Sequence, residues 1–231
     1  MFKTRNRQLE RIDTGDYTAE EYERFLREIS FINRHLGDRR TLKKTLFSEI
    51  KATGLQSFSV LDVGAGSGEL LRAIAIFARK TNRKSKLFGL ELNERSANAI
   101  LQESKDFAEI KSIRGDALRL PFADGSFDYA ICSLFTHHFS DEKIVEILKE
   151  MNRISRRNIF VIDLHRHRIA YIFYKLFCIA FRISPLVRDD GSLSILRSFK
   201  PNELKDLAKK ANLENISVER HFPFRIVLRS T

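Results

Sequence analysis

The segment Val60-Leu61-Asp62-Val63-Gly64-Ala65-Gly66-Ser67-Gly68-Glu69 decides the fold of this chain. Residues 57–63 alternate and end in a β-branched residue, which predicts a strand, and residues 69–80 (ELLRAIAIFARK) carry apolar side chains at helical spacing. The three glycines therefore lie in a turn between a strand and a helix. There a ligand can approach the main chain closely, and the helix presents unpaired N–H groups.

The spacing of this turn narrows the kind of ligand. It reads G-x-G-x-G, whereas the dinucleotide fingerprint G-x-G-x-x-G would need a glycine where Glu69 stands. An acidic side chain there would also repel a pyrophosphate. Asp62 lies at the carboxyl end of the predicted strand, where open α/β sheets bind ligands, and its carboxylate suits a cationic ammonium group.

Strand-like and helical segments alternate beyond the turn. Alternation of this kind predicts crossover units and a mainly parallel sheet. A helix at 201–211 then precedes two segments close enough to pair antiparallel, 216–220 and 225–228. The predicted strands of the alternating part are 58–63, 87–92, 110–114, 127–133 and 159–164, and its helices are 69–80, 94–104 and 141–154.

The residues before the sheet predict a helical extension. Residues 19–50 are expected to form two helices broken near Gly37, with Phe25, Ile29, Ile32 and Leu36 on one apolar stripe. We therefore expect a helical N-terminal extension over 1–55, followed by one domain over 56–231.

The glycine turn resembles motif I of class I S-adenosylmethionine-dependent methyltransferases. In that family the glycines admit the methionine part of the cofactor, and the acidic residue helps to hold its amino group. The resemblance implies a Rossmann-like α/β fold with a seven-stranded, mainly parallel sheet and an antiparallel last strand. It implies S-adenosyl-L-methionine as cofactor, held by Asp62, Gly64, Ala65, Gly66 and Gly68.

Later strand ends extend this resemblance. Glu91 ends the second predicted strand, and by resemblance it holds the ribose hydroxyls, with Leu92 forming one face of the adenine slot. Asp116 and Ala117 follow the third strand and are expected at the adenine edge. Ser133 ends the fourth strand and is expected beside the cofactor.

Residues 120–128 (LPFADGSFD) resemble the small-molecule branch of the family, including enzymes similar to those of ubiquinone and menaquinone synthesis. Asp128 in this segment is expected to cap or orient backbone. The chain lacks the Asn/Asp-Pro-Pro-aromatic tetrad seen in methyltransferases of exocyclic nucleobase amines, and it has no Pro-Cys pair. Both absences argue against methylation of nucleobases.

His137 and His138 follow the fourth predicted strand and are the candidate catalytic residues. A sulfonium donor is already activated, so the enzyme mainly positions the acceptor, and a base helps when the acceptor is a hydroxyl or an enolic carbon. Histidine suits that role, and resemblance favours His138 slightly. Asp163 and His165, after the fifth strand, could add polar contacts. Because no third ligand is in view, we expect no metal site.

An apolar insertion over 165–198 bears on the substrate. Arg166 and Arg168 at its start are expected to pair with an acidic substrate group or to solvate a helix start. Residues 169–181 (IAYIFYKLFCIAF) then carry one charge, Lys175, and are too few to span a membrane. They could form a buried core helix, a lid over an apolar pocket, or an interfacial helix near lipid phosphates. Residues 184–191 are expected to form an ordered loop.

The composition of the chain bears on its partners, on metal binding and on its localisation. The net charge of +11 raises nucleic acid and anionic membranes as partners, yet the excess is spread over helices and no nucleic-acid motif accompanies it, so nucleic acid is not favoured. The two cysteines lie in apolar surroundings without metal-ligand spacing. The basic N-terminus lacks an apolar signal region, which favours a cytoplasmic protein, with peripheral membrane contact left open.

These patterns together predict a methyltransferase that modifies an oxygen or a carbon of a small, lipophilic, hydroxylated or quinol-like substrate. Two alternatives stay open: a methyltransferase of RNA or protein, and a methyltransferase-like binding protein without turnover. The sequence does not define the oligomeric state.

Overall fold

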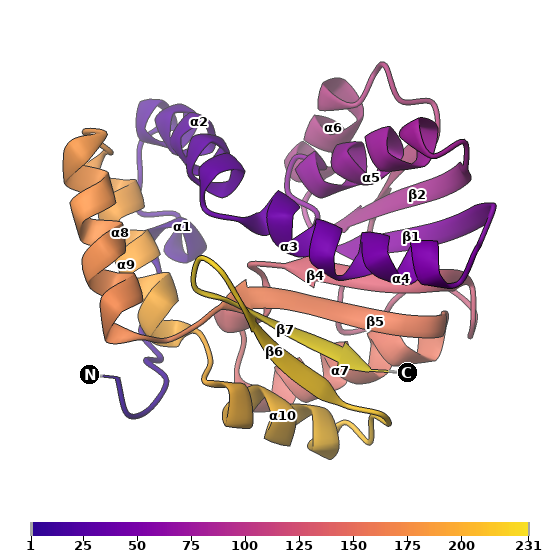
Figure 1. Ribbon diagram of the computed structural model, residues 1–231. Coiled ribbons are helices and arrows are strands. Elements are labelled where there is room, and N and C mark those ends of the chain that lie inside the picture. Colours follow the sequence, from indigo (N-terminus) through magenta and orange to yellow (C-terminus); the bar gives the residue numbers. More distant parts are fainter. Residues whose placement is uncertain (1, 231) are drawn as a thin grey trace.

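A seven-stranded sheet forms the centre of the protein (Figure 1). The computed structural model describes residues 2–230, apart from the side chains of residues 30, 34 and 35. The strands are β1 Ser57–Val63, β2 Lys84–Glu91, β3 Ile110–Arg114, β4 Phe127–Ser133, β5 Ser155–Leu164, β6 Ser217–His221 and β7 Arg225–Ser230. Their order across the sheet is β3-β2-β1-β4-β5-β7-β6.

The order and direction of the strands confirm the predicted fold class. The pairs β1–β2, β1–β4, β2–β3 and β4–β5 are parallel, whereas β7 runs antiparallel to both β5 and β6. From β1, the chain first adds β2 and β3 on one side of the sheet and then β4 and β5 on the other, so β1 lies where the strand order reverses. A crevice at such a switch point is where open α/β sheets bind ligands, so the topology places the glycine turn after β1 at the expected site.

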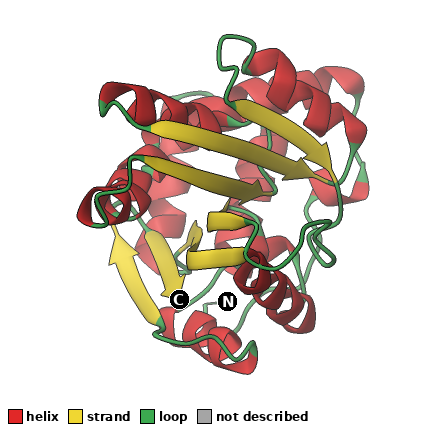
Figure 2. Ribbon diagram, turned by 90° about the vertical axis from the view of Figure 1, so that its right-hand side faces the viewer, coloured by secondary structure: helices red, strands yellow, loops and turns green. Residues whose placement is uncertain are grey.

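Helices cover both faces of the sheet (Figures 1 and 2). On one face, α3 Asp38–Lys44, α4 Leu46–Ala52, α5 Glu69–Lys80 and α6 Glu94–Glu103 contribute to an apolar core with β1 and β2. On the other face, α7 Asp141–Ile154 and α10 Pro201–Lys210 contribute to a second core. Both cores are nearly free of solvent, as expected for a parallel sheet covered by helices.

A third apolar cluster lies beside the sheet, above the carboxyl ends of its strands. It joins α2 Ala19–His35 to α8 Arg168–Ala180 and α9 Pro185–Arg197, and Figure 1 shows these helices grouped away from α5 and α6. Its buried members include Ile32, Tyr174, Val187 and Ile195. The N-terminal extension and the insertion, distant in sequence, therefore form one unit.

The structure corrects two local predictions. The extension contains three helices between residues 19 and 52, not two, because α3 and α4 are separated at Thr45. A short helix, α1 Arg11–Thr14, precedes them. Residues 184–191 are not a loop, since α9 begins at Pro185 and continues through Gly191.

The reason for the second error is a packing contact. Proline as the first helical residue favours a helix start, whereas a glycine in the middle disfavours one. A Cβ at Gly191 would lie 2.1 Å from Oη of Tyr174, so only glycine lets α8 and α9 approach this closely.

No described helix is long and apolar enough to cross a membrane.

Candidate active site

A cavity of about 1290 Å³ opens at the carboxyl ends of β1, β2 and β4. Its walls come from the glycine turn, from the loop after β4, and from the unit formed by α1, α2, α8 and α9. Most of the residues predicted to bind the cofactor or to act in catalysis line it: Asp62, Gly64, Ala65, Gly66, Glu91, Leu92, Ser133, His137 and His138.

The glycine turn has the backbone conformation that its sequence predicts. Gly64 and Gly66 have φ values of +72° and +57°, which favour glycine. A Cβ at Gly64 would lie 2.3 Å from the ring of Phe135, so this glycine admits an aromatic side chain of the β4 loop. A Cβ at Gly66 would meet nothing within 4 Å and would enter the open cavity. The two glycines therefore have different roles, one in packing and one in keeping the ligand space clear.

Asp62 is a buried carboxylate that lacks a partner. Its Oδ1 accepts no hydrogen bond from any described residue, although it lies in the cavity wall. Burial, together with the negative charge of Glu91, raises the pKa of Asp62 to about 8. A buried charge without a partner is costly, so the position suits a ligand that brings a cation.

Glu91 lies across the turn from Asp62, at the end of β2. Its Oε1 accepts a hydrogen bond from the N–H of Gly66 at 2.5 Å, which ties the strand end to the turn. Burial raises the pKa of Glu91, and this hydrogen bond opposes the rise. Leu92 beside it is exposed in the cavity wall. The ribose role of Glu91 stays a prediction.

Three predicted cofactor residues lie outside the cavity wall. Gly68 caps the start of α5, and its N–H donates to the carbonyl of Ala65. Asp116 accepts a hydrogen bond from the N–H of Leu118, and Ala117 is buried in the core. Ser133, in contrast, lies in the wall, and its Oγ has no hydrogen-bond partner among residues 2–230.

His137 is held by a buried carboxylate at the end of β5. Its Nδ1 lies 2.7 Å from Oδ1 of Asp163. The same carboxylate accepts three further hydrogen bonds: Oδ2 from the Thr136 hydroxyl and the His137 N–H, and Oδ1 from the Leu164 N–H. Burial alone would raise the pKa of Asp163, but His137 and these donors lower it to about 2. In the tautomer that carries its proton on Nδ1, His137 donates to Asp163 and leaves Nε2 as the proton acceptor.

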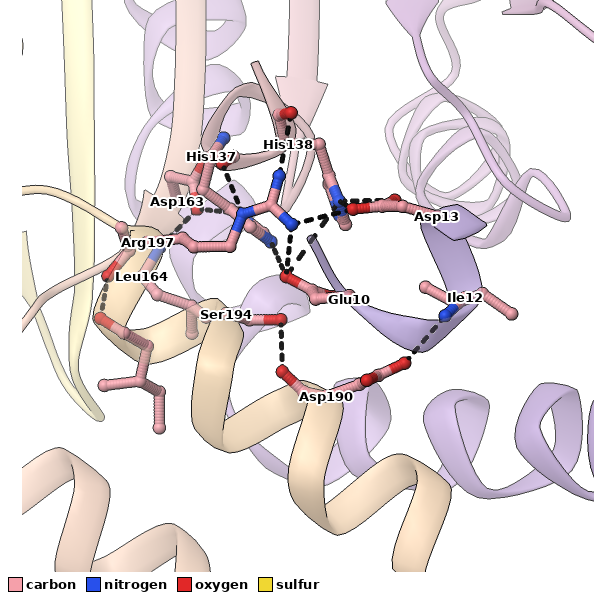
Figure 3. A network of polar contacts seen from close by, with 12 residues as sticks. Glu10, Ile12, Asp13, His137, His138, Asp163, Leu164, Asp190, Ser194 and Arg197 are labelled. Carbon is pink, nitrogen blue, oxygen red and sulfur yellow. Dashed lines mark hydrogen bonds and ion pairs between the residues drawn. The ribbon is translucent and has the colours of Figure 1, made fainter. Parts of the chain in front are cut away.

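The N-terminal segment completes this end of the cavity (Figure 3). Oε1 of Glu10 lies 4.0 Å from Nε2 of His137, and Nδ1 of His138 lies 3.0 Å from Oδ1 of Asp13. Burial raises the pKa of Glu10 to about 7, although the charges of His138 and Arg197 oppose this. Glu10 therefore faces both histidines, since its Oε1 also lies 4.0 Å from Nδ1 of His138, whereas Asp13 pairs with only one of the two, His138.

Arg197, in the last turn of α9, joins these groups. Its Nε and Nη2 donate to the carbonyls of His137 and His138 at 3.2 and 2.8 Å, and its Nη1 lies 2.7 Å from Oδ2 of Asp13. Asp190 lies earlier in the same helix. Its carboxylate accepts hydrogen bonds from the N–H groups of Arg11 and Ile12 and so caps the start of α1. One helix therefore fixes both the histidine loop and the N-terminal segment (Figure 3).

Comparison with known proteins agrees with this geometry. Residues 60–158 match the family described as "Methyltransferase domain". The demethylmenaquinone methyltransferase of Bacillus licheniformis is 30% identical over 96 residues, which cover 42% of this chain and 39% of the relative. That of Staphylococcus aureus is 24% identical over 166 residues, which cover 71% of this chain and 64% of the relative. The chain thus spans less than two thirds of the length of these relatives.

Solved structures show the same fold. Magnesium protoporphyrin IX methyltransferase of Synechocystis, with SAH bound, superposes with a TM-score of 0.63 at 14% identity, covering 92% of this chain and 94% of that one. A SAM-dependent methyltransferase of Aquifex aeolicus gives 0.61 at 15% identity, covering 86% and 92%. Residues 60–158 thus match a methyltransferase domain, and the chain has the fold of class I S-adenosylmethionine-dependent methyltransferases.

The cofactor of this methyltransferase family fits the residues present. S-adenosylmethionine carries an ammonium group, and Asp62 offers a buried carboxylate oxygen without a hydrogen bond. Gly66 leaves space at the turn, and Glu91 and Leu92 lie in the adjoining wall. Asp62, Gly66, Glu91 and Leu92 would therefore hold the cofactor.

Among residues 2–230, one cluster has the spacing of metal ligands. One ligand atom each from Glu10, His137 and His138 lies within 4.8 Å of the others. However, Nη1 of Arg197 lies 3.6 Å from Oε1 of Glu10 and already brings a positive charge to this position. We therefore interpret the cluster as a network of hydrogen bonds and ion pairs.

Sequence reasoning missed four polar residues at the histidine end of the cavity: Glu10, Asp13, Asp190 and Arg197. They belong to the extension and the insertion, outside the segments that resemble the family. The one signal was a pair of acids three residues apart, Glu10 and Asp13, in an otherwise basic segment. Arg166, expected near the substrate or in solvent, is instead buried and pairs with Glu203 and the carbonyl of Ser198.

The predicted apolar stripe of α2 forms part of the cover of the methyltransferase cavity. Phe25, Ile29, Ile32 and Leu36 all line it, opposite the turn that holds Gly66. From the insertion, α8 adds Ala170, Phe173 and Tyr174, and α9 adds Val187, Gly191 and Ile195. The cover is therefore mainly apolar, whereas the polar groups gather at the histidine end.

Proposed function

We propose that this chain transfers a methyl group from S-adenosylmethionine to an oxygen or a carbon of a small, lipophilic, hydroxylated or quinol-like molecule. The observation that carries the proposal is the pair His137–Asp163 in a cavity whose cover is apolar. An apolar wall suits a lipophilic acceptor, and a histidine with a free Nε2 suits removal of a hydroxyl proton.

The bound cofactor supplies a methyl group on a sulfonium, which is already activated for transfer. The residues of the chain position the acceptor, exclude water and accept its proton. His137 takes that proton at Nε2, and Asp163, ionised and 2.7 Å from Nδ1, stabilises the imidazolium that forms. Glu10, 4.0 Å from Nε2, faces the same proton position from the N-terminal segment.

The structure favours His137 over His138 as the base. Both line the cavity, but His138 is more exposed, and its Nδ1 is paired with Asp13, which also pairs with Arg197. Asp163, the partner of the His137 ring, is fully buried, and its carboxylate is fixed by three further donors, the Thr136 hydroxyl and the N–H groups of His137 and Leu164. A base needs a fixed tautomer, and the buried partner provides it.

Relatives of this chain support the substrate class. The similar proteins described above are named for demethylmenaquinone and for magnesium protoporphyrin IX, and both names denote molecules with large ring systems. The sequence segment 120–128 also resembles the small-molecule branch. These similarities do not specify the acceptor, so the experiment must sort acceptors by class.

The test transfers labelled methyl groups from S-adenosylmethionine into cell extract, which is then separated into lipid, nucleic acid, protein and small polar pools. We expect the label in the lipid pool. Label in nucleic acid or protein would instead support a macromolecular methyltransferase. Cofactor binding in calorimetry without label in any pool would support a binding protein without turnover.

Paired histidine variants identify the base. Asparagine can keep a donor at the position of Nδ1 but lacks Nε2, so His137→Asn should retain the contact with Asp163 and lower kcat by about 10²–10⁴-fold. The affinity for S-adenosylmethionine should stay the same. His138→Asn, the matched control, should lower kcat much less, and the reverse order would make His138 the base.

A further inference from the structure

The helix α8 carries an apolar face that stays largely exposed in the described chain. Its edges touch other side chains, since Phe173 lies beside Phe224 and Phe181 lies beside Phe31. Six large apolar side chains between residues 169 and 181 are 44–69% exposed, and they make up half of the twelve exposed large apolar side chains of the described residues. We call them the outer face of α8: Ile169, Ile172, Phe173, Leu176, Ile179 and Phe181. Five of them recur at intervals of one, three or four residues, which places them on one side of the helix.

The opposite side of α8 explains why the helix is held in place. Ala170, Tyr174 and Cys178 are buried against α2 and α9, and the Tyr174 hydroxyl donates to the carbonyl of Val187 at 2.7 Å. Figure 1 shows α8 at the edge of the molecule, on the side away from the sheet. The protein therefore presents the outer face on a firmly packed helix. A patch of this kind marks an interaction surface.

The charges that α8 and its continuation carry themselves have one sign. Arg168, Lys175 and Arg182 are exposed and lie seven residues apart, so they follow one flank of the helix and its continuation. No acidic residue occurs between residues 164 and 188. Apolar side chains flanked only by cations match an anionic lipid surface, where the former enter the acyl boundary and the latter meet phosphates.

We propose that the outer face of α8 docks on an anionic lipid bilayer, with the helix lying in the plane of the interface. Its 13 residues are too few to span the hydrocarbon core. A second copy of the chain fits less well, because a two-fold contact between outer faces would bring Arg168, Lys175 and Arg182 close to the same cations of the partner.

Docking there would also place the cavity near the lipid. Phe173 belongs to the outer face and lines the cavity, and its neighbours Ala170 and Tyr174 line the cavity as well. A lipophilic acceptor could thus pass from the bilayer to the histidine end beside α8. This route rests on the proposed function, whereas the docking itself does not.

The test measures flotation of the full chain with vesicles, without cofactor or acceptor. Vesicles of phosphatidylcholine mixed with phosphatidylglycerol should bind the protein at least about tenfold more tightly than phosphatidylcholine alone, and added salt should weaken binding. The variant Ile172→Ser/Leu176→Ser should reduce this binding at least about tenfold, because two apolar side chains leave the interface. Lys175→Glu/Arg182→Glu should remove the preference for phosphatidylglycerol.

A matched control replaces exposed apolar side chains elsewhere. Ile76→Ser/Leu101→Ser changes α5 and α6, and it should bind vesicles like the original chain. Unchanged thermal unfolding of every variant shows that folding is intact. Absence of vesicle binding, or equal losses in the control, would overturn the proposal, as would self-association in light scattering that the α8 variant abolishes while lipid binding is absent. Vesicle binding without methyl transfer would sustain the docking and refute the proposed function.

Discussion

At the scale of single residues, two glycines of the same turn are required for different reasons, although they look alike in the sequence. Gly64 is needed because the ring of Phe135 occupies the position of a Cβ, whereas Gly66 is needed because the cavity lies there. Asp62 beside them is buried, and its Oδ1 accepts no hydrogen bond from the residues that the structure describes. The cost of such burial at a cavity wall is typical of a site built for a ligand.

Replacement of Gly66 by valine tests the turn. The branched side chain should fill the cavity beside Glu91, so the affinity for S-adenosylmethionine should fall at least about 100-fold in calorimetry, by steric exclusion of the ligand. The positive φ adds a strain of about 1–2 kcal/mol. Gly54→Val is the matched control, because Gly54 also has a positive φ of +67° and open space around it, but lies far from the cavity wall. Equal loss of affinity in both variants would contradict this role.

The raised pKa of Asp62 leads us to expect that the stability of the folded protein falls as the pH rises. Its pKa in the folded protein is about 8, above the ordinary value of 3.8, so between these values the folded state holds a proton that the unfolded chain has released. The free energy of unfolding therefore falls as the pH rises from about 4 to about 8. Asp62→Asn removes this titration and should raise the melting temperature more at pH 8 than at pH 5, while weakening cofactor binding.

Thermal unfolding across this pH range provides the measurement. Glu10, whose pKa is raised to about 7, contributes a fall of the same sign, so Glu10→Gln is measured alongside as a separate correction. Melting curves of Asp62→Asn that run parallel to those of the original chain at every pH would refute the assignment.

At the scale of elements, the insertion is defined by how closely its two helices approach. Gly191 lies inside α9, against the ring and hydroxyl of Tyr174 in α8, and Tyr174 in turn donates to the carbonyl of Val187. The residue that lowers the helix propensity of this segment is therefore the residue that lets the helices pack. Local pattern alone misread it as a loop, because the reason for the glycine lies in another helix.

Gly191→Ala tests this contact, because its expected sign is opposite to that of propensity. In an exposed helix the change would stabilise by up to about 1 kcal/mol, but here the new Cβ would lie 2.1 Å from Oη of Tyr174. We expect a loss of about 1–3 kcal/mol in the free energy of unfolding, measured with denaturant. Adding Tyr174→Leu should restore part of it, and a stabilised single variant would show that the helices are not in close contact.

At the scale of the whole molecule, the reaction end of the cavity is assembled from four distant parts of the chain. The N-terminal segment supplies Glu10 and Asp13, the β4 loop supplies the histidines, β5 supplies Asp163, and α9 supplies Arg197 (Figure 3). Arg197 makes contacts with two of the other three parts. The extension and the insertion thus contribute polar groups to the histidine end of the cavity as well as its apolar cover.

Arg197→Lys tests this assembly. A lysine ammonium cannot reach two carbonyls and a carboxylate together as the planar guanidinium does, so the histidine loop and Asp13 should lose their common partner. We expect methyl transfer to fall at least about tenfold while the affinity for S-adenosylmethionine stays within about twofold. Arg188→Lys is the control, because Arg188 lies in the same helix and its side chain forms an ion pair with the adjacent Asp189; it should change neither methyl transfer nor cofactor affinity. A parallel loss of cofactor affinity in Arg197→Lys would show that the histidine end and the cofactor end of the cavity do not act separately.

The sequence by itself determined the sheet, its strands and most of the residues that line the cavity at the glycine turn, including Asp62, Gly66 and Glu91. These features depend on periodicity and on residues that follow a strand directly, so they are encoded locally. Only the tertiary structure decided that α8 packs on one side and is exposed on the other, that Asp163 orients His137, and that Glu10, Asp13 and Arg197 meet there. Those contacts join residues up to 184 positions apart, as between Asp13 and Arg197, and no local pattern of charge or hydropathy specifies which distant partner a side chain will find.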